Sequence, residues 1–489
     1  MLTKKFGYYL VTIGVSTIVL SLSIDIIDLG HKGIQAAQLL VAEVGVAMVL
    51  FGYIFIVRLD GKPNLGKDLH TWVVQFLSSP IVAVLVGLFT AYFIFFIIPM
   101  FLNTDMRVQY FNRYLPDRYP VGWDLETLLN HIRTWFVLHT PYPGEISQFY
   151  PPLTYVIFSP LVLVDYPTAY KLVTFTTLVS YLFLTLLLPI WVTSERNHSL
   201  AFLMFATGIF SYGLQFELER GQYNVIAMTL CLLAVYLYHF NYKLRYVAYF
   251  LFSISVQLKV FPLIFIFMLI KDWRDWKNNI KRFVGIGLFN IFFLFVLGYR
   301  VFIDFVNAIT EQVVTPSWNW NGNHSIQAFV FNLMKDGYGL IQPDALANLS
   351  DHSLLVTMSL MIIFALCLFL LLASACHHNE GGLNPYLLLV CTIGALIIPT
   401  SNDYTLSFFT GPVVILLCSI AIENAFKLKY FSSFLIAIVS FSYSSTLFPF
   451  KYKPYFLNNN FPALFIILVS ITILYFLRNR YKKSAFKGG

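Results

Sequence analysis

The sequence has few charged residues for its length. Only 11% of its 489 residues are Asp, Glu, Lys or Arg, against roughly 25% in an average globular protein. Apolar residues make up 58% of the chain, and 49 residues are Phe. A length of 489 residues would suggest about three soluble domains, but this composition excludes them. The sequence therefore predicts a protein embedded in lipid.

Several signatures of soluble enzymes and transporters are also missing from the sequence. It has no glycine-rich phosphate loop, no Ser/His/Asp hydrolase signature and no cluster of metal-ligand residues. The five cysteines lie in or beside apolar runs, without the spacing of a disulfide framework. The net charge of +8 comes from short basic clusters, so we do not expect a nucleic-acid partner. We expect no metal and no cofactor, and no feature of the sequence indicates a protein partner.

Apolar runs that suit helical membrane spans recur along the chain. A hydrocarbon core about 30 Å thick needs about 20 apolar residues per pass. The runs that meet or approach this length lie near residues 7 to 28, 37 to 57, 80 to 102, 168 to 192, 199 to 215, 223 to 240, 283 to 303, 353 to 375, 385 to 400, 404 to 421, 430 to 447 and 460 to 477. With the broken run described next, they make roughly fourteen membrane segments. The sequence thus predicts an all-α polytopic membrane protein.

One apolar stretch, residues 246 to 271, is interrupted by Gln257, Lys259 and Pro262 near its middle. A lysine in the hydrocarbon centre costs about 2.5 to 3.5 kcal/mol, and a proline inside a helix leaves a carbonyl without its partner. Both are tolerable beside water or a ligand. We therefore predict two half-helices that meet at Lys259 and enter and leave by the same face.

Basic residues between the runs indicate the orientation of the chain, since positively charged loops stay in the cytoplasm. This rule places both termini there. The first run follows Lys4 and Lys5 like a signal peptide, but no cleavage site follows it, so we interpret it as a retained helix. The segments left outside are 103 to 167, 216 to 222, 304 to 352, 399 to 404 and 448 to 459. We expect the functional site on this extracytoplasmic side of the cell membrane.

The first outer segment contains an amphipathic pattern. Leu125, Leu128, Leu129, Ile132, Trp135 and Phe136 recur at helical spacing opposite Glu126, Asn130, His131 and Arg133, which predicts a helix in the membrane interface. The run from Tyr150 to Leu163 is too short for a full pass, and we expect it to re-enter or lie flat. Asp124 stands just before the helix. It could cap the helix or act as a general base in a partly dry site.

The other outer segments supply further polar candidates. Residues 219 to 224 pack Glu219, Arg220, Gln222 and Asn224 into one connection, which suits either a plain polar turn or a cavity lining. Lys259 suits either a structural lysine or a cation for a phosphate. The segment Trp318 to Ser325 contains Trp320, Asn323 and His324. Indole faces and amides of this kind could bind a sugar, although a capped surface loop would look similar.

Several short motifs in one order resemble glycosyltransferase family 87, which includes the polyprenol-phosphate-mannose-dependent mannosyltransferases and has a GT-C fold. They are Asp124 about seventeen residues before Pro141-Tyr142, then Tyr150-Pro151-Pro152-Leu153, Gly221-Gln222-Tyr223-Asn224, Lys259 before Pro262, Asn323-His324-Ser325 and Ser401-Asn402-Asp403-Tyr404. The resemblance covers roughly residues 80 to 450. It implies a GT-C-like multi-helix bundle with an interfacial amphipathic helix in the first large outer loop.

The resemblance also implies an activity, namely transfer of a hexose, most simply mannose, from a polyprenyl-phosphate donor to an acceptor hydroxyl with inversion. The acceptor would be a glycan or a glycolipid. Asp124 matches the family's base. Lys259, assisted by Arg220 or His324, would neutralise the donor phosphate. The residues expected at the sugar are Gln222, Asn224, Asn323 and Trp320. The chain departs from the family in the late outer turn, where members often carry a histidine and this sequence has Asn402, Asp403 and Tyr404.

On this basis we divide the chain into three parts. Residues 1-79 form an N-terminal pair of spans and a cytoplasmic loop outside the resemblance, 80-450 the catalytic region, and 451-489 the last span and a basic tail. Two other functions remain open at this stage. A helix broken near a charge is also how secondary transporters or flippases build a site, and a polymerase or ligase acting on lipid-diphosphate-linked glycans would use similar outer cations.

Overall fold

The computed structural model of the protein describes residues 9, 12–17, 80–92, 121–142, 150–193, 198–272, 274–314, 322–336, 352–375, 383–398, 401–423, 429–447 and 460–487. Nearly all of the proposed N-terminal part, residues 1-79, lies outside these ranges, as does Trp320. The predicted spans at 7 to 28 and 37 to 57 therefore stay predictions.

The described part of the chain is helical, which confirms the all-α prediction, and its residues form no strand beyond an isolated bridge between Asn323 and Asn402. The α-helices are α4 (Pro80–Tyr92), α7 (Trp123–Leu138), α8 (Pro152–Phe158), α9 (Tyr166–Leu182), α10 (Leu188–Val192), α11 (His198–Gly208), α12 (Tyr212–Arg220), α13 (Asn224–Phe240), α14 (Arg245–Leu258), α15 (Trp276–Leu294), α16 (Tyr299–Val314), α17 (Ile326–Asp336), α19 (Ser353–Ala375), α20 (Pro385–Ile397), α21 (Thr410–Glu423), α22 (Lys429–Thr446) and α23 (Phe461–Lys487). Tighter or wider helical segments are η2 (Ser159–Leu163), η3 (Phe183–Leu187), η5 (Tyr242–Leu244), η6 (Phe261–Leu269) and η8 (Asp403–Phe409).

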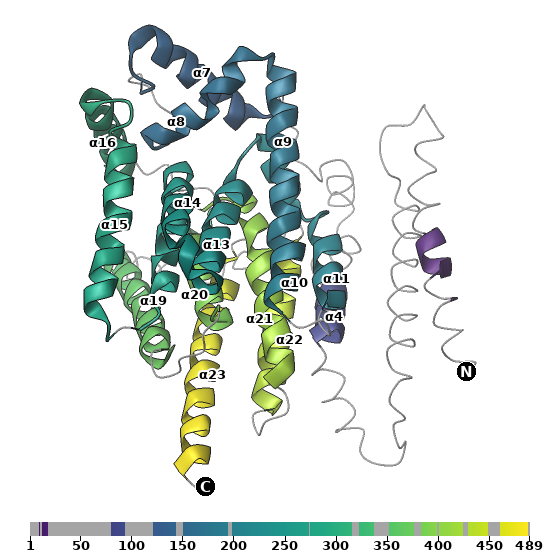
Figure 1. Cartoon of the computed structure of the whole chain (residues 1–489). Coiled ribbons are helices and arrows are strands. Elements are labelled where there is room, and N and C mark those ends of the chain that lie inside the picture. Colours follow the sequence, from purple (N-terminus) through teal and green to yellow (C-terminus); the bar gives the residue numbers. More distant parts are fainter. Residues whose placement is uncertain are drawn as a thin grey trace, which may run out of the picture.

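The long helices stand side by side in an upright bundle, and α7 and α8 lie across one end of it (Figure 1). The helix α16 lies at that same end, whereas α23 runs to the opposite end, where the C-terminus is found (Figure 1). Apolar packing follows this division. A large buried cluster joins α13, α14, α20, α21, α22 and α23, and a smaller one joins α7, α8, the start of α13 and α16.

Two of the described helices are long and apolar enough to cross a membrane. They are Tyr166–Val192, in which α9, η3 and α10 follow one another without a break, and Ser353–Ala373, which is most of α19. Two bent helix pairs would each supply one more span if the pair crosses as a unit. The protein is therefore a helical membrane protein. The expected total of roughly fourteen segments stays a prediction.

Both bent pairs correct predicted runs. The run 199 to 215 is not one helix, because α11 ends at Gly208 and α12 begins at Tyr212 with a bend of 51°. The run 283 to 303 is interrupted at Gly298, whose φ is 92°, and α16 leaves α15 at 100°. Hydropathy alone missed both breaks because apolar residues continue through them. The helix α12 continues to Arg220 and α13 begins at Asn224, so the polar turn is confined to residues 221 to 223.

The predicted break at Lys259 is confirmed. The helix α14 ends at Leu258, Lys259 has extended backbone with φ −148° and ψ 136°, and Pro262 lies in the first turn of η6. The two arms return to the same end of α13. Near the start of α14, Tyr249 contacts the ring of Tyr238, and near the end of η6 the Met268 carbonyl lies 2.7 Å from Nε2 of His239.

The predicted helix after Asp124 is also present as α7, although its buried face differs in part from the expectation. Leu125, Leu128, Leu129 and Ile132 are buried as predicted. His131, expected on the polar face, is buried beside them, whereas Phe136 is 55% exposed. The helix contacts α8, η2 and α12 mainly through its first three turns. Its last residues extend beyond these neighbours and are therefore exposed.

Two glycines allow α7 to approach the end of α12. Gly122 caps α7 with a φ of 82°, and its N–H donates to the Glu219 carbonyl at 2.6 Å. Gly221 ends α12 with a φ of 65°, and a Cβ atom there would lie 2.8 Å from Cβ of Leu125. Only glycine adopts this left-handed conformation at no steric cost. The junction therefore sets the position of Asp124 relative to the turn after α12.

We predict that Gly221→Ala lowers the free energy of unfolding by about 1–3 kcal/mol, because the new methyl group meets both a positive φ and the Leu125 side chain. Thermal unfolding in detergent measures the change. The matched control is Gly285→Ala within α15, where an added Cβ meets nothing within 4 Å and the helix should become slightly more stable. Equal unfolding temperatures for the two variants would contradict this account of the junction.

Candidate active site

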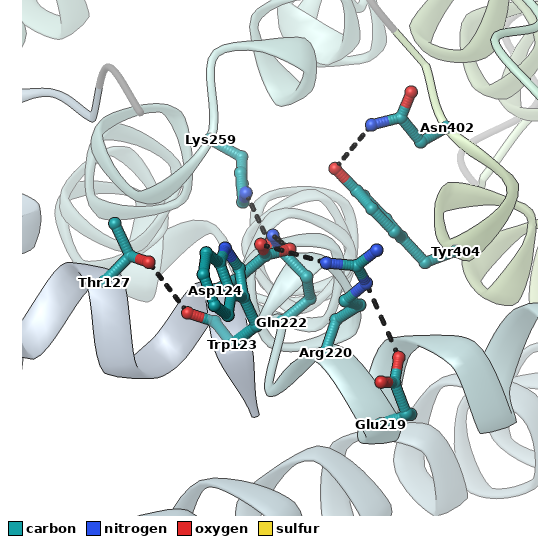
Figure 2. Close-up of polar contacts among 9 residues, drawn as sticks. All are labelled: Trp123, Asp124, Thr127, Glu219, Arg220, Gln222, Lys259, Asn402 and Tyr404. Atoms are coloured by element: carbon teal, nitrogen blue, oxygen red, sulfur yellow. Dashed lines mark hydrogen bonds and ion pairs between the residues drawn. The ribbon is translucent and has the colours of Figure 1, made fainter. Parts of the chain in front are cut away.

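The carboxylate of Asp124 lies against the turn that follows α12 (Figure 2). It accepts a hydrogen bond of 2.6 Å from Nε2 of Gln222, and Nη1 of Arg220 lies 3.8 Å from its other oxygen. The side chains of Asp124 and Arg220 keep 15% and 14% of their surface exposed. Asp124 is the second residue of α7, and Gly122 is the capping residue. The position of Asp124 is therefore suited to contact with a substrate as well as to the start of a helix.

Lys259 reaches the same turn from the break between α14 and η6. Its ammonium group donates to Oε1 of Gln222 at 2.8 Å. It also lies over the rings of Tyr150 and Tyr223, at 4.5 and 4.6 Å from their centroids. Two aromatic faces stabilise a partly desolvated cation electrostatically. Lys259 is thus held as a charged group at the junction of three segments that are far apart in the sequence.

Tyr150 remains a neutral phenol in this arrangement. Burial, and to a lesser degree the nearby Asp124 carboxylate, raises the pKa of Tyr150 well above its ordinary value. Its face can therefore receive the Lys259 ammonium without competition from a phenolate. The sequence marks Tyr150 only as the start of a short run and of a motif, and the structure adds this contact.

Arg220 has a second carboxylate and an aromatic ring beside it. Its Nε lies 3.5 Å from Oε2 of Glu219, and its guanidinium carbon lies 5.2 Å from the centre of the Phe216 ring. Phe216 in turn contacts the ring of Tyr404. The Tyr404 hydroxyl accepts a hydrogen bond from the Asn402 side chain (Figure 2). The late outer turn is therefore adjacent to the cluster of Asp124, Arg220 and Lys259.

Glu217 is a buried carboxylate that sequence analysis missed. It is fully buried and accepts hydrogen bonds from the Asn224 side chain, the Val225 N–H and the Ser407 hydroxyl. These bonds tie α12 to the start of α13 and to η8. Glu217 lies in the outer segment 216 to 222, where Glu219 and Arg220 follow it closely, so its charge alone did not distinguish it from a solvated loop residue.

The remaining expected residues form a joint between two outer segments. The Asn323 side-chain oxygen accepts from the N–H groups of Ser325 and Ser401. His324 is fully buried; its Nε2 lies 3.0 Å from the Asp403 carboxylate, and its Nδ1 accepts from the Asn460 N–H at 3.3 Å. Asp403 thus lies in the late outer turn, where the family resemblance implies a histidine, and it meets a histidine from the preceding outer segment.

The structure therefore brings together four of the predicted site residues, Asp124, Arg220, Gln222 and Lys259. It places Asn224 behind them on Glu217, and Asn323 with His324 in the adjoining joint. Trp320 lies outside the described residues. Among the residues that the structure describes, no group of three or more His, Cys, Asp or Glu side chains could hold a metal ion.

The family model of glycosyltransferase family 87 matches residues 149–399, slightly more than half of the chain. The chain belongs to glycosyltransferase family 87. It is therefore a glycosyltransferase, and with its apolar helices a membrane-embedded one. The match includes Gln222, Lys259 and His324, whereas Asp124 precedes it. No curated protein and no solved structure matches the chain.

We predict that His324→Ala destabilises this family 87 protein by about 1–3 kcal/mol, because the Asp403 carboxylate and the Asn460 N–H both lose a buried partner. The measurement is thermal unfolding, compared with His352→Ala, a change at an exposed histidine before α19. If His324→Ala unfolds at the same temperature as the control, the contacts of His324 do not stabilise the protein by this amount.

Proposed function

We propose that the protein transfers a hexose from a polyprenyl-phosphate donor to the hydroxyl of a glycan or glycolipid acceptor. Mannose is the hexose that the family resemblance favours. The observation that carries the proposal is a carboxylate, Asp124, that lies 3.8 Å from the Arg220 guanidinium and shares the Gln222 amide with the Lys259 ammonium. Membership in a glycosyltransferase family favours this function over transport.

The chemistry needs one base and a balanced leaving group. The acceptor oxygen attacks the anomeric carbon while its proton passes to a carboxylate oxygen of Asp124. The bond from the anomeric carbon to the phosphate oxygen breaks, and its electrons leave with the phosphate. A single displacement of this kind inverts the anomeric carbon.

Lys259 and Arg220 suit the leaving group. The donor phosphate is a diester with one negative charge, and the departing monoester gains a second charge. Cations already in place in a partly dry site stabilise that new charge more strongly than they would in water. With two cations available, we propose that the reaction needs no divalent metal, which activity in the presence of a chelator would test.

The positions of the basic residues support an extracytoplasmic site. The helix α13 begins beside the site at Asn224, and its 17 residues span about 25 Å. At its far end Lys271 and Arg282 lie over the ring of Tyr238, and Lys243 follows shortly after. Basic residues favour the cytoplasmic side. We therefore propose that the site faces outward and that both termini are cytoplasmic.

The direct test is sugar transfer by the purified protein from a polyprenyl-monophosphate sugar. We expect Asp124→Asn to lower kcat by about 10²–10⁴-fold, because the base is lost. Lys259→Ala should lower it by about 10²-fold or more, because the leaving group loses a preorganised positive charge. Initial rates measured with a radiolabelled donor give both values.

Matched controls are Asp165→Asn and Lys171→Ala, two exposed positions at the start of α9. Asp165→Asn should retain native activity because asparagine also caps helices well. Lys171→Ala should retain it because the Lys171 side chain is exposed and far along the chain from the site residues. Native activity in both site variants would refute the assigned roles. Transfer from a lipid-diphosphate donor but not from the monophosphate would instead indicate the polymerase or ligase alternative.

A further inference from the structure

The amide of Gln222 lies between the two opposite charges of the site (Figure 2). Its nitrogen donates to Asp124 at 2.6 Å, and its oxygen accepts from Lys259 at 2.8 Å. An ammonium group can only donate hydrogen bonds, and a carboxylate can only accept them. One orientation of the amide therefore satisfies both neighbours, and the chemistry of those neighbours determines which one it is.

The backbone around Gln222 holds this amide in place. Gly221 ends α12 in the left-handed region, and the Gln222 N–H donates to the Glu217 carbonyl at 2.9 Å. The next residue, Tyr223, lies beneath the Lys259 ammonium. The residue Gln222 is 3% exposed. Both polar ends of the amide are thus engaged, and the side chain has little freedom to turn toward a sugar.

A neutral bridge has a chemical consequence that a direct ion pair would not have. If Lys259 and Asp124 touched, each charge would be committed to the other, and separating them in a partly dry site would be costly. The amide instead forms one hydrogen bond with the Lys259 ammonium and one with the Asp124 carboxylate, and neither group loses its charge. The ammonium group keeps its charge for an incoming phosphate, and the carboxylate stays able to accept a proton.

We propose that Gln222 is a positioning residue that holds Lys259 and Asp124 as two separate charges, and that it acts through them rather than by binding the sugar. This inference deepens the proposed function and rests on it. It assigns Gln222 a different task from the sugar contact that the family resemblance implies.

Two substitutions test the inference. Gln222→Glu keeps the shape of the side chain and adds a negative charge, which should pair with Lys259 and repel Asp124. We expect the KM for the polyprenyl-phosphate donor to rise about tenfold or more. We also expect the acid limb of the kcat/KM profile to move upward by about one pH unit, because a second negative charge favours protonation of the base. Gln222→Leu removes both hydrogen bonds and should lower kcat at least tenfold.

The control is Gln327→Glu on α17, the same chemical change at an exposed residue, which should leave the KM and the pH profile unchanged. Donors that each lack one sugar hydroxyl separate positioning from sugar binding. A positioning role predicts that Gln222→Leu slows all donors by the same factor. Thermal unfolding of each variant identifies any loss of folded protein.

Three results would overturn the inference, and only the third would also overturn the proposed function. Native-like KM and pH profile in folded Gln222→Glu would overturn this inference and leave the proposed function intact. So would a Gln222→Leu variant that loses discrimination against one deoxy donor only, because that pattern marks a sugar contact. A native chain that transfers no sugar from the monophosphate donor would overturn the proposed function and this inference with it.

Discussion

The site depends on one constraint: Lys259 carries a positive charge at a position that little water reaches. The cost of such a charge falls when polar and aromatic groups replace its hydration. The Lys259 ammonium is stabilised by the side-chain amide oxygen of Gln222 and by two tyrosine faces. The Asp124 carboxylate lies on the other side of the same amide. The helix α14 ends at Leu258, directly before Lys259, so the irregular backbone lies at the residue whose ammonium group enters the cluster.

The other parts of the site follow from that requirement. The carboxylate that faces Lys259 comes from α7, which lies across the end of the bundle, so α7 has to dock closely on the turn after α12. Gly122 and Gly221 permit the close approach. Glu217 then fixes the turn from behind, with three hydrogen bonds to α13 and η8. The positions of Asp124 and Gln222 are therefore set by backbone contacts and buried polar pairs, not by flexible side chains alone.

The sequence was sufficient for the parts of this arrangement that change hydropathy locally. A lysine and a proline inside an apolar stretch predicted the break at Lys259, and the amphipathic pattern after Asp124 predicted α7. The bend between α15 and α16 could not be predicted, because apolar residues continue through Gly298. Nor could the Gln222 bridge, since it depends on contacts with Asp124, 98 positions away, and with Lys259, 37 positions away, which no local pattern encodes. The order of the motifs predicted the family, whereas the contacts of each site residue could be identified only in the structure.

The central claim is that the donor phosphate binds at Lys259 with the Asp124 carboxylate facing the acceptor. The most direct measurement is an electron cryomicroscopy structure of the protein with a non-reactive polyprenyl-phosphate sugar analogue. We predict the phosphate within hydrogen-bond distance of Lys259 Nζ, with Arg220 beside it and the anomeric carbon between the phosphate and Asp124. A phosphate bound elsewhere, with Lys259 still held by Gln222 and the two tyrosines, would contradict the account.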